Sequence, residues 1–235
     1  MTTSDLPDEL EDAHAQWSRR HGGLNPHGSI WVSGWVSLID ACAKPLALRR
    51  ISPNAVTIFG TAVTAAVPLL AWAGSAWLLI AVPVVVAAAV LDGVDGAVAS
   101  RTGTTSRWGQ VFDSLADRIS DLLLVLTLVV LGAPLWLGAA LGGVMLLHES
   151  LRATAQAAGL EGPGAVTIAE RPTRVIVAAF ALFLCGVEWT ARKAGADLLP
   201  QLDGGVIAIG ATSVGLTIAL IGLGHLLLAV RRRLA

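Results

Sequence analysis

The sequence has few charged residues, few cysteines and no apolar leader at its start. Only 14% of its 235 residues are charged, against about 25% in a typical soluble domain, while 54% are hydrophobic and the mean hydropathy is +0.70. This shortage of charge argues against an ordinary soluble domain and predicts an integral membrane protein. The net charge of -1 gives no sign of a nucleic-acid partner, and we expect none.

The two cysteines, Cys42 and Cys185, each stand alone in apolar or amphipathic sequence, so we expect neither a disulfide framework nor a metal-ligand pair. We expect both to be buried free thiols. The stretch before residue 29 is polar and acidic, so we expect no signal peptide. Residues 1–28 are predicted to form a polar cytoplasmic tail.

Six apolar segments are each long enough to cross a membrane, which takes about 20 residues of helix. Lipid offers no hydrogen-bond partners, so each segment is expected to be helical. They are, roughly, Pro53–Trp72, Ala76–Ala99, Trp108–Leu131, Pro134–Ala157, Arg174–Ala191 and Gly204–Val230. The sequence therefore predicts an all-α integral membrane protein, with six transmembrane helices forming one domain over residues 53–235.

Residues 29–52 have a different pattern. Tryptophans such as Trp31 and Trp35 alternate there with charged residues such as Asp40 and Lys44. This mixture is typical of an amphipathic helix that lies in the membrane interface. Pro45 is expected to kink or interrupt the helix. A seventh short span is the alternative.

Basic residues predict the orientation, because they accumulate on the cytoplasmic side of membrane proteins. Six spans place both termini on one side, together with the loops after the second and fourth spans. Fourteen basic residues fall on that side and two on the other. The fourteen are Arg19, Arg20, Lys44, Arg49, Arg50, Arg101, Arg107, Arg118, Arg152, Arg171, Arg174 and Arg231–Arg233. We therefore expect a multi-pass protein of the cell membrane with both termini and the active site cytoplasmic.

Four aspartates stand at the facing ends of the second and third predicted spans. Asp92 and Asp95 close the second span, and Asp113 and Asp117 open the third. Residues three or four apart share one face of a helix. The connection between the spans is short, so the helices are expected to be antiparallel neighbours whose carboxylates converge. Ionisable residues within a membrane are costly and indicate function.

Four converging carboxylates repel one another unless cations bind them. Mg2+ prefers oxygen ligands and commonly bridges to substrate phosphates. Two ions about 4 Å apart would clamp a diphosphate. We therefore expect two Mg2+ ions, with Mn2+ as an alternative, bound by the four aspartates. Gly93, Gly96 and Gly109 lack side chains on the same turns, which would let a bulky ligand approach the backbone.

The stretch from Leu91 to Asp121 resembles the signature of the CDP-alcohol phosphotransferase family. That signature is D-x-x-D-G-x-x-A-R, then eight residues, then G-x-x-x-D-x-x-x-D. The matching residues are Asp92, Asp95, Gly96, Ala99, Gly109, Asp113 and Asp117. The resemblance implies that the first three aspartates are metal ligands. It implies that Asp117 is both a ligand and the general base for the acceptor hydroxyl.

The resemblance also implies a homodimer and a CDP-linked lipid donor held over Gly96, Ala99 and Gly109. Where the signature has arginine this chain has Ser100, and we expect the next residue, Arg101, to take that role. Asn54, in the Ser-Pro-Asn start of the first span, resembles the family's usual entry to that helix and is included in the donor site.

Three arginines predict the acceptor. Arg152, Arg171 and Arg174 are expected to face the aspartates, and guanidinium forks suit phosphate. The surrounding sequence resembles the bacterial phosphatidylinositol phosphate synthase branch, which takes a phosphorylated inositol. Arg152 stands where that branch has a lysine, and Glu149 where it has a small hydroxyl residue. The alternative is that the arginines only anchor the protein at lipid headgroups.

The sequence thus predicts transfer of a phosphatidyl group from CDP-diacylglycerol to a small, phosphorylated alcohol, with release of CMP. Inositol phosphate is the favoured acceptor, and glycerol 3-phosphate or another alcohol is the alternative. Two hypotheses of other classes stay open. A divalent-cation transporter would also carry carboxylates in its spans, and a non-catalytic family member would explain Ser100.

Overall fold

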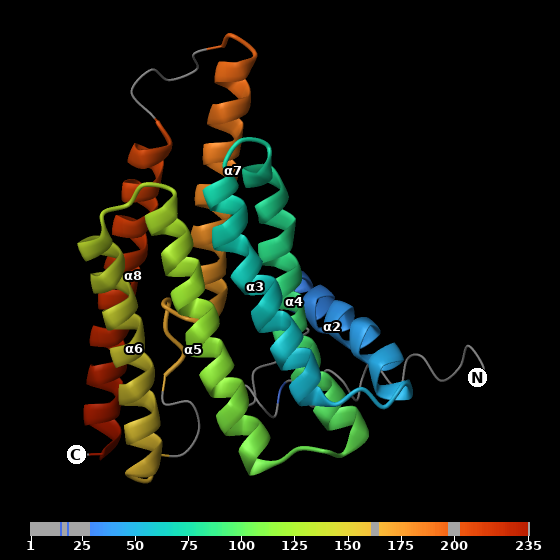
Figure 1. The fold of residues 1–235 in the computed structure, drawn as a ribbon. Coiled ribbons are helices and arrows are strands. Elements are labelled where there is room, and N and C mark those ends of the chain that lie inside the picture. Colours follow the sequence, from blue (N-terminus) through green and yellow to red (C-terminus); the bar gives the residue numbers. More distant parts are fainter. Residues whose placement is uncertain (1–14, 16–17, 19–28, 161–164, 197–202, 235) are drawn as a thin grey trace. The chain divides into compact units, whose positions relative to one another are not determined.

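The computed structural model describes residues 29–160, 165–196 and 203–234, together with Ala15 and Ser18. All regular structure in this part of the chain is helical (Figure 1). The helices are α2 (Ile30–Leu48), α3 (Pro53–Ala73), α4 (Trp77–Thr102), α5 (Arg107–Val130), α6 (Leu135–Ala157), α7 (Arg171–Lys193) and α8 (Gly204–Leu234). Each coincides with a predicted segment, which confirms the all-α class. Apart from Ala15 and Ser18, the predicted tail over residues 1–28 lies outside the described residues.

Four of these helices, α3, α4, α7 and α8, are long and apolar enough to cross a membrane, with mean hydropathies of 1.7 to 2.3 over their best stretches. Helices α5 and α6 are less apolar. Four charged residues lie between positions 113 and 121 of α5, and α6 ends in a polar segment. The protein is therefore a multi-helix membrane protein, and the number of six spans stays a prediction.

The chain divides into two compact units. Unit 1 comprises Met1–Gly60 and Val90–Ser114, and unit 2 comprises Thr61–Ala89 and Leu115–Ala235. Unit 1 therefore holds α2, the start of α3, the end of α4 and the start of α5. Unit 2 holds the remaining parts of α3, α4 and α5, with all of α6, α7 and α8.

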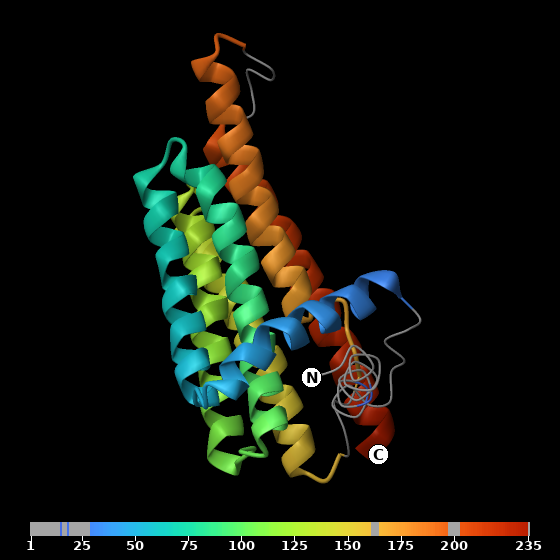
Figure 2. The same ribbon diagram turned by 90° about the vertical axis from the view of Figure 1, so that its right-hand side faces the viewer.

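In unit 1, α2 packs directly on the end of α4. Figure 2 shows α2 running across that part of α4 rather than along it. A Cβ added at Gly93 would collide with Cδ1 of Ile39, and Ala43 is fully buried in the same contact region. The expectation that Gly93 leaves room for a bulky ligand is therefore wrong, because the side chain of Ile39 fills that space.

The other face of α2 is apolar and exposed. Ile30 and Trp31 are almost fully exposed, and Leu38 and Leu48 are also exposed, whereas Val36 and Ala43 are buried. An exposed apolar face opposite a packed face is typical of a helix on a membrane surface. The interfacial placement of α2 stays a prediction that these exposures support.

Helix α2 is not interrupted at Pro45. It continues to Leu48, and the backbone N–H of Arg49 donates to the carbonyl of Pro45 at 3.2 Å. A proline removes only the hydrogen bond that its own nitrogen would make to the preceding turn. Because Pro45 lies one turn from the end of the helix, the remaining residues still close their last turn.

Unit 2 is a bundle in which both α6 and α7 pack against α8 (Figure 2). Its core includes the fully buried Ala181, Leu182 and Ala208. Small residues allow close approach between helices, as is common in membrane bundles. At Gly186 of α7, an added Cβ would lie 2.6 Å from Cδ2 and 2.8 Å from Cγ of Leu79.

We expect the substitution Gly186→Ala to destabilise unit 2 by about 1–3 kcal/mol, because the new methyl group overpacks the contact with Leu79. Thermal unfolding in detergent measures this change. Gly143→Ala is the matched control, since nothing lies within 4 Å of a Cβ at Gly143. There, alanine's better helix propensity should raise stability by up to about 1 kcal/mol. Equal melting temperatures for the two variants would contradict the packing at Gly186.

Candidate active site

Asp95 is the most deeply buried of the four signature aspartates, with 4% of its surface exposed. Its Oδ2 accepts a hydrogen bond from the hydroxyl of Thr57 at 2.6 Å, and its Oδ1 accepts one from the backbone N–H of Gly96 at 2.6 Å. Thr57 was not predicted as a site residue. It stands three residues after Asn54 on α3, and that spacing on one helix face was the available signal.

Asp113 lies close to Asp92. Within unit 1, one carboxylate oxygen of Asp113 lies within 4.8 Å of one of Asp92. Asp117 follows one turn later on the continuous helix α5, at a spacing that places it on the same helix face as Asp113. Oxygens at such separations fit around a shared hard cation such as Mg2+, whose ligands are oxygens at about 2.1 Å. Asp95 is not a member of this close group, and its oxygens accept hydrogen bonds from Thr57 and Gly96.

Asn54 and Gly109, both predicted for the donor site, are neighbours in unit 1. A Cβ added at Gly109 would lie 3.8 Å from Oδ1 of Asn54 and 3.1 Å from the hydroxyl of Ser106. Ser106 caps α5, since its hydroxyl accepts the backbone N–H of Gly109 at 2.9 Å. The absence of a side chain at Gly109 thus keeps the start of α5 open beside Asn54.

Arg101 is fixed by a residue of α2. Its Nε and Nη2 donate to the two oxygens of Asp40 at 2.8 and 2.7 Å, which is a bidentate ion pair. The end of α4 is formed by Gly103, which has a φ of +64°, and by a hydrogen bond from Thr104 N–H to the carbonyl of Ala99 at 3.0 Å. Sequence reasoning missed Asp40, whose spacing from Arg101 gives no local signal.

In unit 2, Asp117 lies between two arginines. Its Oδ1 contacts Nη1 of Arg171, and its Oδ2 lies 3.7 Å from Nη1 of Arg118. The side chains of Asp117 and Arg171 are 25% and 22% exposed. The predicted base and one predicted acceptor arginine are therefore brought together, and both keep some exposure.

Arg174 is more deeply held, with only 9% of its side chain exposed. Its Nη1 donates to Asp121, its Nη2 donates to Glu149 at 2.9 Å, and its Nε donates to the carbonyl of Ala169 at 3.1 Å. Glu149 also accepts a hydrogen bond from Nη2 of Arg118 at 3.2 Å. Arg118 and Asp121, both on α5, therefore pair with residues of other helices.

Arg152 forms a bidentate ion pair with Glu170, at 3.1 and 2.5 Å. Glu170 also accepts the backbone N–H of Thr167 at 3.0 Å. Burial raises the pKa of Glu170, but the hydrogen bonds from Arg152 and Thr167 outweigh it and leave the pKa below its usual value. The pair therefore stays ionised at neutral pH and fixes the segment before α7.

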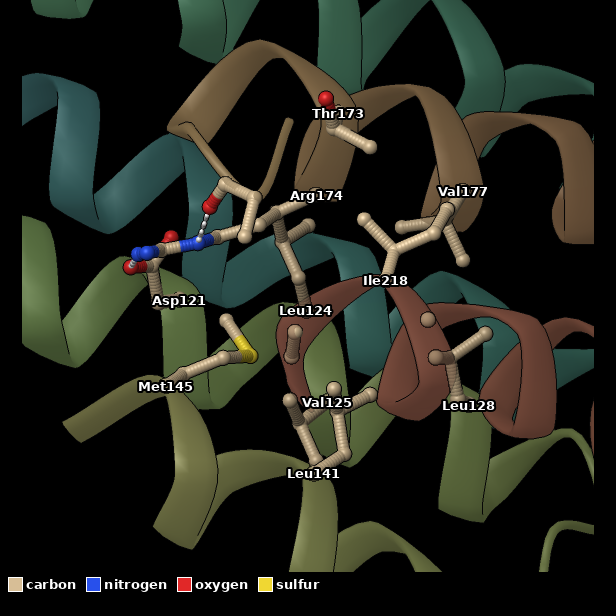
Figure 3. Close-up of a pocket in the computed structure, with 14 residues that line it drawn as sticks. Asp121, Leu124, Val125, Leu128, Leu141, Met145, Thr173, Arg174, Val177 and Ile218 are labelled. Atoms are coloured by element: carbon tan, nitrogen blue, oxygen red, sulfur yellow. Dashed lines mark hydrogen bonds and ion pairs between the residues drawn. The ribbon is translucent and has the colours of Figure 1, made fainter. Parts of the chain in front are cut away.

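A mostly apolar pocket lies beyond Arg174 inside unit 2 (Figure 3). Its empty volume is about 430 Å³, and Asp121 and Arg174 form its charged end. Side chains such as Leu141 and Met145 line the remainder. The pocket therefore adjoins the charged cluster without containing the signature aspartates.

Comparison with known proteins identifies the family. A sequence model described as CDP-alcohol phosphatidyltransferase matches residues 50–224, which is more than half of the chain. The chain therefore belongs to the CDP-alcohol phosphatidyltransferase family and is a membrane transferase of phospholipid synthesis. This membership leaves the divalent-cation transporter hypothesis without support.

Two relatives within the family have names that specify their product. The chain is 33% identical over 183 residues to a phosphatidylinositol phosphate synthase of Mycobacteroides abscessus, covering 68% of this chain and 76% of that protein. It is 39% identical over 137 residues to an archaetidylinositol phosphate synthase of Aeropyrum pernix, covering 55% and 68%.

The fold is also that of a solved structure. The phosphatidylinositol phosphate synthase of Mycobacterium tuberculosis, crystallised with CDP-DAG bound, matches with a TM-score of 0.62 and 24% identity, over 82% of this chain and 92% of that one. The same enzyme has been solved in complex with manganese and citrate. At this identity the likeness establishes the fold.

We expect Thr57→Val to destabilise unit 1 by about 1.5–3 kcal/mol, the usual range for a hydrogen bond to a charged group, because buried Asp95 loses its side-chain donor. Valine keeps the shape of threonine. Thermal unfolding measures the change. The control Thr217→Val removes an exposed hydroxyl that bonds only within its own helix, so the melting temperature should stay unchanged. An unchanged Thr57→Val melting temperature would show that Asp95 does not depend on Thr57.

Proposed function

We propose that this protein transfers a phosphatidyl group from CDP-diacylglycerol to the hydroxyl of inositol phosphate and releases CMP. The observation that carries the proposal is the signature set on α4 and α5, in which Asp113 lies close to Asp92 in unit 1 and Asp117 follows one turn later on α5. Relatives named for phosphatidylinositol phosphate and archaetidylinositol phosphate synthesis support an inositol phosphate acceptor. The CDP-DAG in the M. tuberculosis structure supports the donor.

Asp92, Asp95, Asp113 and Asp117 would bind two divalent ions, Mg2+ or Mn2+. The carboxylate oxygens of Asp92, Asp113 and Asp117 suit a hard divalent ion, whereas those of Asp95 already accept hydrogen bonds from Thr57 and Gly96. The manganese complex of the M. tuberculosis enzyme supports the choice of metal. When bound, the ions would offset the charge of the donor diphosphate and of the departing CMP. Thr57 keeps Asp95 in a fixed orientation beside Gly96.

The donor would lie over Gly96, Ala99 and Gly109. Asn54 would contact the donor too, and its place next to Gly109 supports this. Arg101 would balance donor charge in place of the arginine that Ser100 replaces. The bidentate pair with Asp40 fixes the guanidinium of Arg101 at the end of α4.

Asp117 would act as the general base. It would take the proton of the acceptor hydroxyl while the hydroxyl oxygen forms a new bond to the donor's lipid-linked phosphorus. The anhydride bond to CMP breaks in the same displacement, and CMP leaves with the electron pair. Arg171 orients the carboxylate of Asp117 through its direct contact. Such a base must reach the reacting proton at about 3 Å.

Arg152, Arg171 and Arg174 would form the acceptor site. All three belong to unit 2 with Asp117, and guanidinium groups suit phosphate.

We also propose that the protein has six membrane spans, that its termini and active site are cytoplasmic, and that it forms a homodimer. The excess of basic residues on one side supports the orientation. The family resemblance supports the dimer.

Asp117→Asn should lower CMP release from CDP-diacylglycerol and inositol phosphate by about 100-fold or more, the usual contribution of a general base. Asn keeps the size of the side chain but takes up no proton. The matched control is Asp203→Asn. Asp203 caps α8 by accepting the N–H of Val206, and asparagine caps helices equally well, so CMP release should not change. Retained turnover in Asp117→Asn would remove Asp117 as the base. No CMP release by the wild type with any acceptor would favour the non-catalytic hypothesis.

Arg171 and Arg174 should respond differently to replacement. Arg171→Gln should raise the KM for inositol phosphate about tenfold without a large loss of stability, because its side chain lies at the partly exposed end of the cluster. Arg174→Gln should lower the free energy of unfolding by about 3–5 kcal/mol, because Asp121 and Glu149 lose their buried partner. An unchanged KM in Arg171→Gln would exclude that residue from the acceptor site.

A further inference from the structure

Glu149 of α6 lies between two arginines from different helices. Its Oε1 accepts a hydrogen bond from Nη2 of Arg174 at 2.9 Å, and its Oε2 accepts one from Nη2 of Arg118 at 3.2 Å. The Glu149 side chain is 14% exposed. Two guanidinium groups that converge on a pair of oxygens are the usual arrangement for binding a phosphate or carboxylate ligand. Here the protein's own carboxylate stands where such a ligand would bind.

Glu149 therefore neutralises arginines that would otherwise attract an anion. Arg174 uses both terminal nitrogens and its Nε on Asp121, Glu149 and a backbone carbonyl. Arg118 uses Nη2 on Glu149. An acceptor phosphate that approached either arginine would have to displace Glu149, which would leave a largely buried carboxylate without its cation. Such uncompensated charge is costly.

The other two arginines of this cluster have different partners. Arg152 pairs with Glu170, which belongs to the segment before α7, and Arg171 contacts Asp117, the proposed base. The cluster contains equal numbers of arginines and carboxylates. Among the described residues of the cluster these are Arg118, Arg152, Arg171 and Arg174 with Asp117, Asp121, Glu149 and Glu170.

We propose that Glu149 is the specificity-determining residue of the acceptor site, setting how strongly the enzyme prefers a phosphorylated over an uncharged alcohol. Its fixed negative charge offsets the charges of Arg118 and Arg174 and so weakens the attraction of the acceptor site for a phosphate. The inference rests on the proposed function. Its consequence is an enzyme that discriminates only modestly between inositol phosphate and inositol.

The test compares the wild type with Glu149→Gln and Glu149→Asp in CDP-diacylglycerol micelles, with CMP release measured against inositol phosphate and against inositol. Removing one negative charge beside the acceptor site should lower the KM for inositol phosphate about tenfold, leave kcat within about twofold and leave the KM for inositol unchanged. Glu149→Asp keeps the charge, so its KM values should stay near those of the wild type.

The matched control is Glu188→Gln. Glu188 pairs with Arg192 and lies fourteen residues beyond Arg174 on α7, about 21 Å along a helix. It should change neither KM. A Glu149→Gln variant whose KM for inositol phosphate is unchanged, or shifts equally for both acceptors, overturns the proposal.

A double variant keeps the test decisive if Glu149→Gln loses its thermal transition. Glu149→Gln with Arg118→Gln removes both members of one pair and leaves the net charge unchanged, so the KM for inositol phosphate should match the wild type. A KM raised about tenfold would show that Arg118 binds the phosphate, and would overturn the inference.

Turnover by the wild type separates the proposed function from this inference. A wild type without CMP release ends the proposed function and this inference together, whereas an active wild type with unaltered selectivity in Glu149→Gln ends only the inference.

Discussion

This structure depends on the pairing of its few charged side chains. An uncompensated charge in a low-dielectric interior is expensive, so buried carboxylates need an arginine, a hydrogen-bond donor or a cation. In unit 2, arginines from α5, α6 and α7 meet carboxylates from α5, α6 and the segment before α7, and these ion pairs fix the helix ends that carry the site. Asp92 and Asp113 in unit 1 lie close to each other instead, which is the arrangement that a divalent ion requires.

The same constraint explains the role of α2. Its residue Asp40 pairs with Arg101 at the end of α4, and its residue Ile39 fills the space at Gly93. Both contacts lie within a few residues of the signature aspartates. Helix α2, which lies outside the family signature, thus helps to position the signature residues at the end of α4. Thr57 of α3 has a similar role, because its hydroxyl orients the buried carboxylate of Asp95.

Helices α3 to α8 could be located from the apolar segments of the sequence, because a chain in lipid satisfies its backbone hydrogen bonds best as a helix. Helix α2 was located from its amphipathic pattern. The aspartate pairs were predictable once the segments were taken as helices, because spacings of three and four residues place side chains on one helix face. Pro45 was predicted to kink or interrupt α2; it does not interrupt it, because it lies one turn from the end and the helix continues through it. Gly93 was predicted to open space for a ligand, but a neighbouring helix fills that space.

By itself, the sequence determined the membrane class, the helix boundaries to within a few residues, the family and the four aspartates. These depend on local periodicity, composition and a signature that is contiguous along the chain. Only the tertiary structure decided which carboxylate pairs with which arginine, because the partners of Arg101, Arg152 and Arg174 lie 18 to 61 residues away in the chain. Such pairings depend on how helices face one another, and no local spacing records that orientation.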